Sequence, residues 1–201
     1  LIESGEFDEA QIDTMVCNII ELKFQLGLFD NPYTDPGHFP HMVNAEHLQA
    51  AKDSALASCV LLKNEHQTLP LSKDSLSSVA VIGPLADDGY EQLGTWVFDG
   101  ESHHSHTCLQ AIYDIAGEDV DVRWARGMAS SRCRTGDGFD DAVRIAQESD
   151  VALMFLGEES ILSGEAHCRA EIDLPGNQEQ LIEAVAATGK PIVLIVMAGR
   201  P

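Results

Sequence analysis

The sequence predicts an α/β fold in which a mostly parallel sheet is sandwiched between helices. Short, continuously apolar runs of strand length occur at residues 79–82, 151–156 and 191–197. Amphipathic segments typical of helices alternate with them, at residues 109–116, 140–149 and 178–188. Strands that are apolar on both faces are typical of a parallel sheet that helices cover on each side. We therefore expect the chemistry of the protein at the carboxyl ends of these strands, where such sheets bind ligands.

Two further patterns extend the predicted sheet. Residues 60–64 form a short apolar segment, and residues 120–124 alternate between apolar and polar side chains. We expect a strand at each place. Residues 59–201 are thus predicted to form one sandwich domain, which we expect to be incomplete because the chain stops directly after a strand.

Residues 1–58 follow a different pattern. A helix is predicted from Asp8, a residue type that favours the N-cap, to Leu26, and its apolar face recurs with helical spacing. Nothing of similar length nearby could cover that face, so we expect residues 1–30 to be the tail of a domain that lies mostly upstream. Pro and Gly punctuate residues 31–40 like a linker, and a second helix is predicted at 44–58. Residues 31–58 are therefore interpreted as an interdomain linker that contains a helix.

The negative charge of the chain excludes some classes of binding partner. It has 12 Lys and Arg against 33 Asp and Glu, a formal net charge of −21. Such an acidic protein repels phosphates, which argues against binding to nucleic acid and to anionic membrane surfaces. No apolar run approaches the roughly 18 residues that a spanning helix needs, so no membrane partner is predicted. A neutral ligand such as a sugar is compatible with this charge.

The loop that follows the run at 151–156 carries the strongest signal for chemistry. It places Glu158, Glu159, Glu165, His167 and Arg169 beyond the carboxyl end of a buried strand. A carboxyl that serves as a general acid must stay protonated near neutral pH, which burial or a neighbouring negative charge can achieve. The alternative from composition alone is a solvated acidic loop on an already acidic protein.

Other candidate sites are weaker. His103, His104 and His106 suggest metal ligands, but the run lies in a Gly/Ser-bounded loop without matched acidic or thiol ligands, so a solvated loop is favoured and no metal is predicted. Gly83-Pro84 is not a phosphate loop, because proline removes a donor N–H and no glycine motif follows. A nucleotide- or flavin-binding domain would need such a loop, and no cofactor is predicted. Cys133 and Cys168 lie in loop-like stretches, where a disulfide between them is possible.

Several stretches resemble one known family. Residues 163–169 (Ser-Gly-Glu-Ala-His-Cys-Arg) and 172–178 (Ile-Asp-Leu-Pro-Gly-Asn-Gln) are similar to the acid/base loop of glycoside hydrolase family 3. Other matches follow in the family's order, to the end of its N-terminal (β/α)8-type barrel and to its C-terminal α/β sandwich, at residues 23–33, 59–71, 79–87, 93–96 and 188–201. Because the matches span essentially the whole chain, it is identified as an internal piece of such an enzyme, of the β-glucosidase type. The family usually has serine where Cys168 stands.

The resemblance implies a specific function. Glu165 matches the catalytic acid/base of a retaining, exo-acting enzyme that hydrolyses terminal β-D-glucosyl residues of β-glucosides or β-linked oligosaccharides, with β-xylosides as an alternative substrate class. The nucleophile, an aspartate, belongs to the family's barrel and has no counterpart here. The implied partners are therefore the substrate and the barrel of the same protein, and the chain alone should be inactive. Many family members are periplasmic or secreted, and the same is expected here.

Four further residues are predicted to bind substrate. Trp96 and Phe98 would form an aromatic wall at the aglycone subsite, although burial as packing residues is an equal alternative. Arg169 would orient Glu165 or hold the loop, unless it is simply a surface arginine, and Glu158 would be a second carboxylate near the site. The competing class of function is a domain that only binds carbohydrate or supports the barrel. A catalytic role for Glu165 distinguishes the two.

Overall fold

The computed structural model describes residues 1–38 and 44–199. The chain divides into two compact units, Leu1–Cys59 and Val60–Pro201. In the described parts of the chain, no helix has the length and apolar character needed to cross a membrane.

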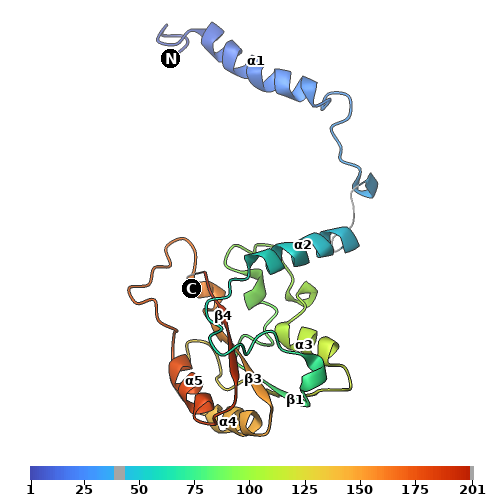
Figure 1. Ribbon diagram of the computed structural model, residues 1–201. Helices are drawn as coiled ribbons and strands as arrows, with labels where there is room; N and C mark the ends of the chain where they lie inside the picture. The colour runs from blue at the N-terminus through green and yellow to red at the C-terminus, as the bar shows by residue number, and fades with distance from the viewer. Residues whose placement is uncertain (39–43, 200–201) are drawn as a thin grey trace. The chain divides into compact units, whose positions relative to one another are not determined.

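The first unit contains the helices α1 (Glu9–Gln25) and α2 (Ala45–Ser58) and a short 3₁₀ turn, Pro36–His38 (Figure 1). The predicted cap at Asp8 is present, since its carboxylate accepts the Ala10 N–H at 3.0 Å. Asn44 caps α2 in a similar way, and its side chain accepts the His47 N–H at 2.8 Å. Neither helix buries a residue within the described chain. Both helices are confirmed, whereas the assignment of residues 1–30 to an upstream domain stays a prediction.

The second unit is built on a four-stranded sheet with the order β2-β1-β3-β4. The strands are β1 (Ser78–Ile82), β2 (Asp121–Ala125), β3 (Val151–Gly157) and β4 (Ile192–Met197). Every neighbouring pair is parallel, which confirms the predicted architecture. The carboxyl ends of all the strands therefore lie along one edge of the sheet.

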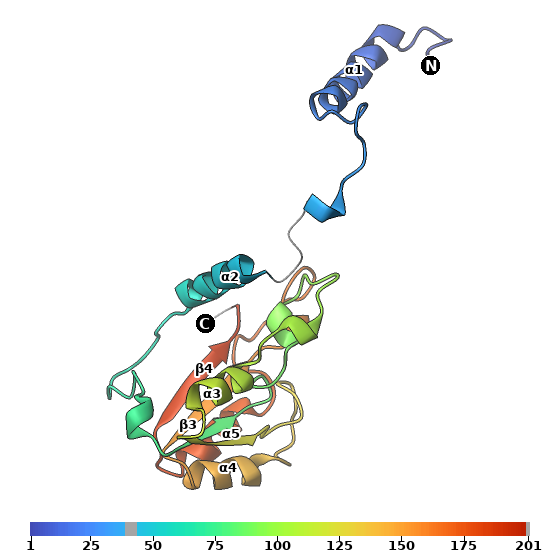
Figure 2. The same cartoon turned by 90° about the vertical axis from the view of Figure 1, so that its right-hand side faces the viewer.

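Alternating strand residues build a core layer on each face of the sheet. One layer packs against α3 (Cys108–Ala116) and contains Val81 and Phe155. The other packs against α4 (Phe139–Gln147) and α5 (Gln178–Ala186) and contains Ile82 and Leu156. Figure 2 looks onto α3, with the strands behind it. Burial on both faces explains why these strands are continuously apolar in sequence.

The predicted strand at residues 60–64 is wrong. This segment has no regular structure, and Val60, Leu61 and Leu62 are 73%, 65% and 63% exposed. A strand needs a neighbour that satisfies its backbone groups, and within the described sheet β1 pairs only with β2 and β3. The segment instead ends in a loop that the Asn64 side chain closes through two hydrogen bonds to the Leu69 backbone, of 2.8 and 3.1 Å.

Candidate active site

The candidate site lies where three loops leave the carboxyl edge of the sheet, at residues 83–107, 126–138 and 158–177. The last of these projects beyond the sheet as the orange segment of Figure 1. Its departure depends on Gly157, whose φ is 146°. A Cβ at this position would lie 2.1 Å from the carbonyl oxygen of Met197, so only glycine lets β3 turn away beside β4.

Glu165 occupies an unusual turn near the middle of the 158–177 loop. Its neighbours Gly164 and Ala166 both have positive φ, 104° and 63°. Such a conformation is strained for alanine, and strain of this kind concentrates at functional sites. The turn is held by His167, whose N–H donates to Gly164 at 3.2 Å and whose Nδ1 donates to the Ser163 carbonyl at 2.9 Å. Glu165 itself is exposed, and no described side chain bonds to its carboxylate.

Trp96 lies next to this turn. A Cβ at Gly164 would lie 3.6 Å from Cζ2 of Trp96 and 2.5 Å from Cγ2 of Thr95, so the two loops touch at this glycine. The contact is fixed at Ser160, whose carbonyl accepts the Thr95 hydroxyl at 2.8 Å and whose N–H donates to the Glu91 carboxylate. The structure thus brings Trp96, which is 61% exposed, beside the Glu165 turn.

Phe98 is 86% exposed, more than Trp96. It lies in the loop that also carries Trp96, two residues further along the chain. Its role in an aromatic wall stays a prediction.

Glu158 and Arg169 form an ion pair with each other. Their side chains are only 7% and 16% exposed, and Arg169 also donates to the Asp173 carbonyl at 2.7 Å. The pair joins the beginning of the 158–177 loop to its later part. These contacts are compatible with a role of Arg169 in holding the loop, and its predicted role at the site stays a prediction.

Sequence reasoning missed Arg132, in the loop after β2. Its Nε lies 2.5 Å from the Glu159 carboxylate, which is 13% exposed. The hydrogen bond and charge of Glu159 raise the pKa of Arg132 above its ordinary value, with a smaller contribution from the Glu91 charge. The two residues are far apart in sequence, and no local pattern could have paired them.

Gln178 is the second missed residue, and it is completely buried. Its amide contacts the backbone of Gly157, Ser131 and Pro175, as described below. The sequence predicted Gln178 as the start of a helix and as the end of the 172–178 stretch that resembles the family's loop, but gave it no role of its own. Local sequence does not distinguish a buried glutamine from an exposed one at that position.

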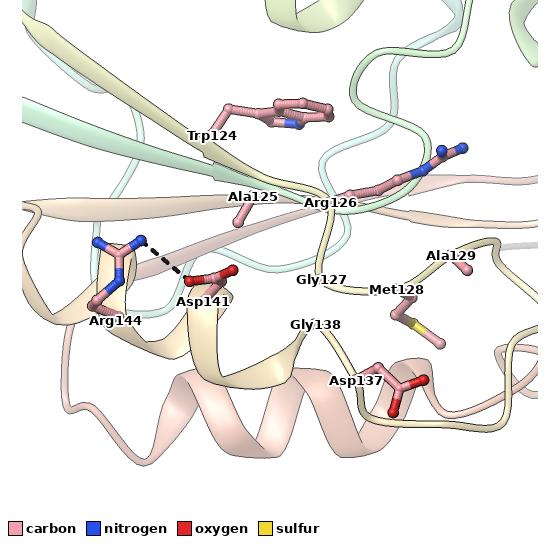
Figure 3. A pocket seen from close by; sticks show the side chains of 10 residues that line it. All are labelled: Trp124, Ala125, Arg126, Gly127, Met128, Ala129, Asp137, Gly138, Asp141 and Arg144. Atoms are coloured by element: carbon pink, nitrogen blue, oxygen red, sulfur yellow. Dashed lines mark hydrogen bonds and ion pairs between the residues drawn. The ribbon is translucent and has the colours of Figure 1, made fainter.

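A cavity of about 420 Å³ lies at the end of β2, apart from the predicted site residues (Figure 3). Trp124 and Arg126 lie on one side of the strand, and Asp141 and Arg144 of α4 lie on the other. Arg144 is paired with Asp141 at 3.3 Å. The cavity therefore wraps around the edge strand and does not open onto Glu165.

Among the described residues, the only group with metal-like spacing is Glu101, His103 and His104. Their side chains are exposed, and the Glu101 carboxylate lies 3.3 Å from Nδ1 of His103 and 3.7 Å from Nε2 of His104. Exposed His–Glu contacts of this kind are common on acidic surfaces. All five thiols are free, and Cys133 instead contacts Thr135, whose hydrogen bonds lower the pKa of the thiol.

Comparisons with a family model and with known proteins point to the same family of glycoside hydrolases. Residues 59–201 match the model of the glycosyl hydrolase family 3 C-terminal domain. A periplasmic β-glucosidase of Salmonella typhimurium is 34% identical over 100% of this chain and 29% of its own length. A β-xylosidase of Formosa agariphila is 32% identical over 94% of this chain and 27% of its own length.

The fold gives the same relationship. The crystal structure of a β-glucosidase from Listeria innocua in complex with isofagomine superposes with a TM-score of 0.85 at 30% identity. It covers 100% of this chain, which corresponds to 27% of that protein. The chain thus spans less than a third of the length of each of these relatives.

Proposed function

The chain belongs to glycosyl hydrolase family 3, and we propose that it supplies the general acid/base, Glu165, of a retaining β-glycosidase. The observation that carries this proposal is the turn at Glu165. A strained backbone presents an exposed carboxylate, with no partner among the described residues, at the carboxyl edge of a parallel sheet and beside an exposed tryptophan. Ligands of such sheets bind at this edge, and sugars pack against aromatic faces.

The reaction needs a second carboxylate. In a retaining mechanism, a nucleophile attacks the anomeric carbon while the acid protonates the departing oxygen. The same acid, now a base, then activates water to hydrolyse the glycosyl-enzyme. We assign the role of the nucleophile to an aspartate of the barrel of the same protein, and the role of the acid/base to Glu165. Their carboxyl groups would then lie about 5–5.5 Å apart in the assembled enzyme.

The exposure of Glu165 has a consequence for this assignment. A general acid gains the proton affinity it needs from burial or from nearby negative charge. The described residues leave the Glu165 carboxylate in water, so the barrel must supply that environment. The chain alone should therefore be inactive, and docking of the two domains would set the geometry of catalysis.

The substrate we propose is a β-glucoside or a β-linked oligosaccharide, with cleavage at the terminal β-D-glucosyl residue. The β-glucosidases among the similar proteins support a glucoside, and the β-xylosidase supports a xyloside as the alternative. Trp96 and Phe98 would contact the aglycone. A periplasmic or secreted location is proposed because one relative is named as periplasmic.

The test is chemical rescue of Glu165→Ala in the full-length enzyme with an activated aryl β-glucoside. An activated aryl group leaves without acid catalysis, and azide, already an anion, needs no base catalysis to attack the glycosyl-enzyme, so it should restore turnover and yield β-glucosyl azide. Wild-type activity of the variant, with no azide effect, would move the acid/base elsewhere. Residues 59–201 would then only bind carbohydrate or support the barrel.

A further inference from the structure

We propose that Gln178 is a positioning residue for this reaction, because its amide fixes both ends of the loop that presents Glu165. The inference rests on the function proposed above. It concerns the side chain that sets where the catalytic carboxylate stands, and Gln178 itself touches neither substrate nor Glu165.

The contacts of Gln178 all go to backbone groups at the base of the 158–177 loop. Its Oε1 accepts the N–H of Gly157 at 2.8 Å, and its Nε2 lies 2.8 Å from the Gly157 carbonyl oxygen. Nε2 also lies 2.9 Å from the carbonyl oxygens of Pro175 and Ser131. One buried amide thus joins the end of β3, the end of the 158–177 loop and the loop after β2.

Glutamine is specifically suited to this place. The amide orientation is fixed, since a flipped amide would set Oε1 against three carbonyl oxygens. The two protons on Nε2 are shared among these three acceptors. A glutamate would bring a negative charge to the same carbonyls, and an apolar side chain would take this partner from the backbone groups of Gly157, Ser131 and Pro175.

The position of Glu165 depends on these anchors because its own side chain has none. Between Gly157 and Pro175 the described contacts to other parts of the chain include the Glu158 N–H bond to the Met197 carbonyl, the Ser160 contacts, and the ion pair of Glu159 with Arg132. A shift at the base of the loop is therefore passed on to the turn at Glu165. Misplacement of a catalytic group by about 1 Å can cost on the order of 100-fold in rate.

The experiment compares leaving groups in the full-length enzyme. The variants are Gln178→Met, which keeps the shape but removes the hydrogen bonds, Glu165→Gln and the double variant. Gln180→Met is the matched control, because Gln180 is an exposed glutamine on the same helix. The substrates are aryl β-glucosides with a poor leaving group (4-methylphenol) and a good one (2,4-dinitrophenol), and kcat/KM is measured for each.

If Gln178 positions the acid, Gln178→Met should lower kcat/KM for the poor leaving group by about 10- to 100-fold. The variant should leave kcat/KM for the substrate with the good leaving group nearly unchanged, because that leaving group departs without being protonated. The double variant should be no slower than Glu165→Gln alone on the poor leaving group, and Gln180→Met should resemble the wild type. If Gln178 had a purely structural role, Gln178→Met would instead lower kcat/KM equally for both substrates, and this loss would add to the effect of Glu165→Gln.

The two proposals fail in different ways. If Glu165→Gln shows no leaving-group selectivity, the proposed function fails. If Glu165→Gln is selective but Gln178→Met is not, only the positioning role is overturned.

A second variant covers the case in which Gln178→Met does not fold, as judged by circular dichroism. Gln178→Glu can still donate one hydrogen bond when protonated, but not when ionised. Its selective loss on the poor leaving group should therefore grow with rising pH relative to the wild type. The same pH profile as the wild type, with equal losses on both substrates, would overturn the proposal.

Discussion

The two edges of the sheet are closed by side chains of different chemistry. At the amino edge, one carboxylate oxygen of Asp150 accepts the N–H groups of Ser77 and Ser78 at 2.8 and 2.9 Å and lies 3.3 Å from the Ser78 hydroxyl. At the carboxyl edge, Gln178 both donates and accepts. Asp150 joins β3 to β1 with a charge, whereas Gln178 joins β3 to two loops without one.

The hydrogen bonds of Asp150 depend on pH, whereas those of Gln178 do not. Backbone donors from Ser77 and Ser78 lower the pKa of Asp150, so this clamp weakens when acid protonates it. An amide does not titrate, so the hydrogen bonds of Gln178 do not change with pH. The edge that carries the proposed chemistry is thus held by the clamp that protons do not alter.

The largest expected effect comes from Glu165→Gln at the carboxyl edge. We expect kcat/KM for poor leaving groups to fall by about 10²- to 10⁴-fold, the usual contribution of a general acid. The thermal unfolding midpoint should stay unchanged, because Glu165 is exposed and has no partner among the described residues. A drop in the midpoint together with a mild loss of activity would show that the turn serves the fold rather than the reaction.

A smaller effect should separate the two ion pairs of the 158–177 loop. Arg169→Met breaks an ion pair whose side chains are 16% and 7% exposed, and we expect a cost of about 3 kcal/mol. Arg132→Met breaks a pair whose arginine is 54% exposed and should cost less than about 1 kcal/mol. Hydrogen exchange of the loop amides, measured in each of the two variants, reports how far each change destabilises the loop. Equal protection in the two variants would contradict this ranking.

The smallest effect is expected at the amino edge, from Asp150→Asn. The lowered pKa means that Asp150 contributes stability above the pKa of about 3.9 that an unfolded aspartate has. That contribution is lost as the pH falls through the lower, folded-state pKa. Urea midpoints should therefore differ between variant and wild type at pH 7 and converge in acid, with kcat unchanged. A difference that persists at the lowest pH would rule out the charge as its cause.

The local sequence pattern was sufficient to predict the parallel sheet, but not the hydrogen bonds that Asp150 and Gln178 make at its two ends. Strands such as 79–82 and 151–156 are apolar because both faces are covered, and a single pattern records that burial. Residues 60–64 have the same apolar pattern without a partner strand, so the pattern alone was misleading there.

The candidate site divides in the same way. Glu165 and Trp96 could be selected because each belongs to a stretch that resembles a known family. The contacts of Gln178 and of Arg132 join residues from different loops. Only the folded sheet brings these partners together, so their pairing is not written in any local pattern.

Closure of the loop base by one amide also bears on how the length of residues 158–174 can vary. Gly157 and Pro175 meet at Gln178 whatever the length of the chain between them. Because doubling a flexible loop costs only about 0.6 kcal/mol in closure entropy, insertions in this segment need not disturb the strands. Grafting the corresponding segment of a relative between these two anchors is therefore a direct route to exchanging substrate preference on an unchanged scaffold.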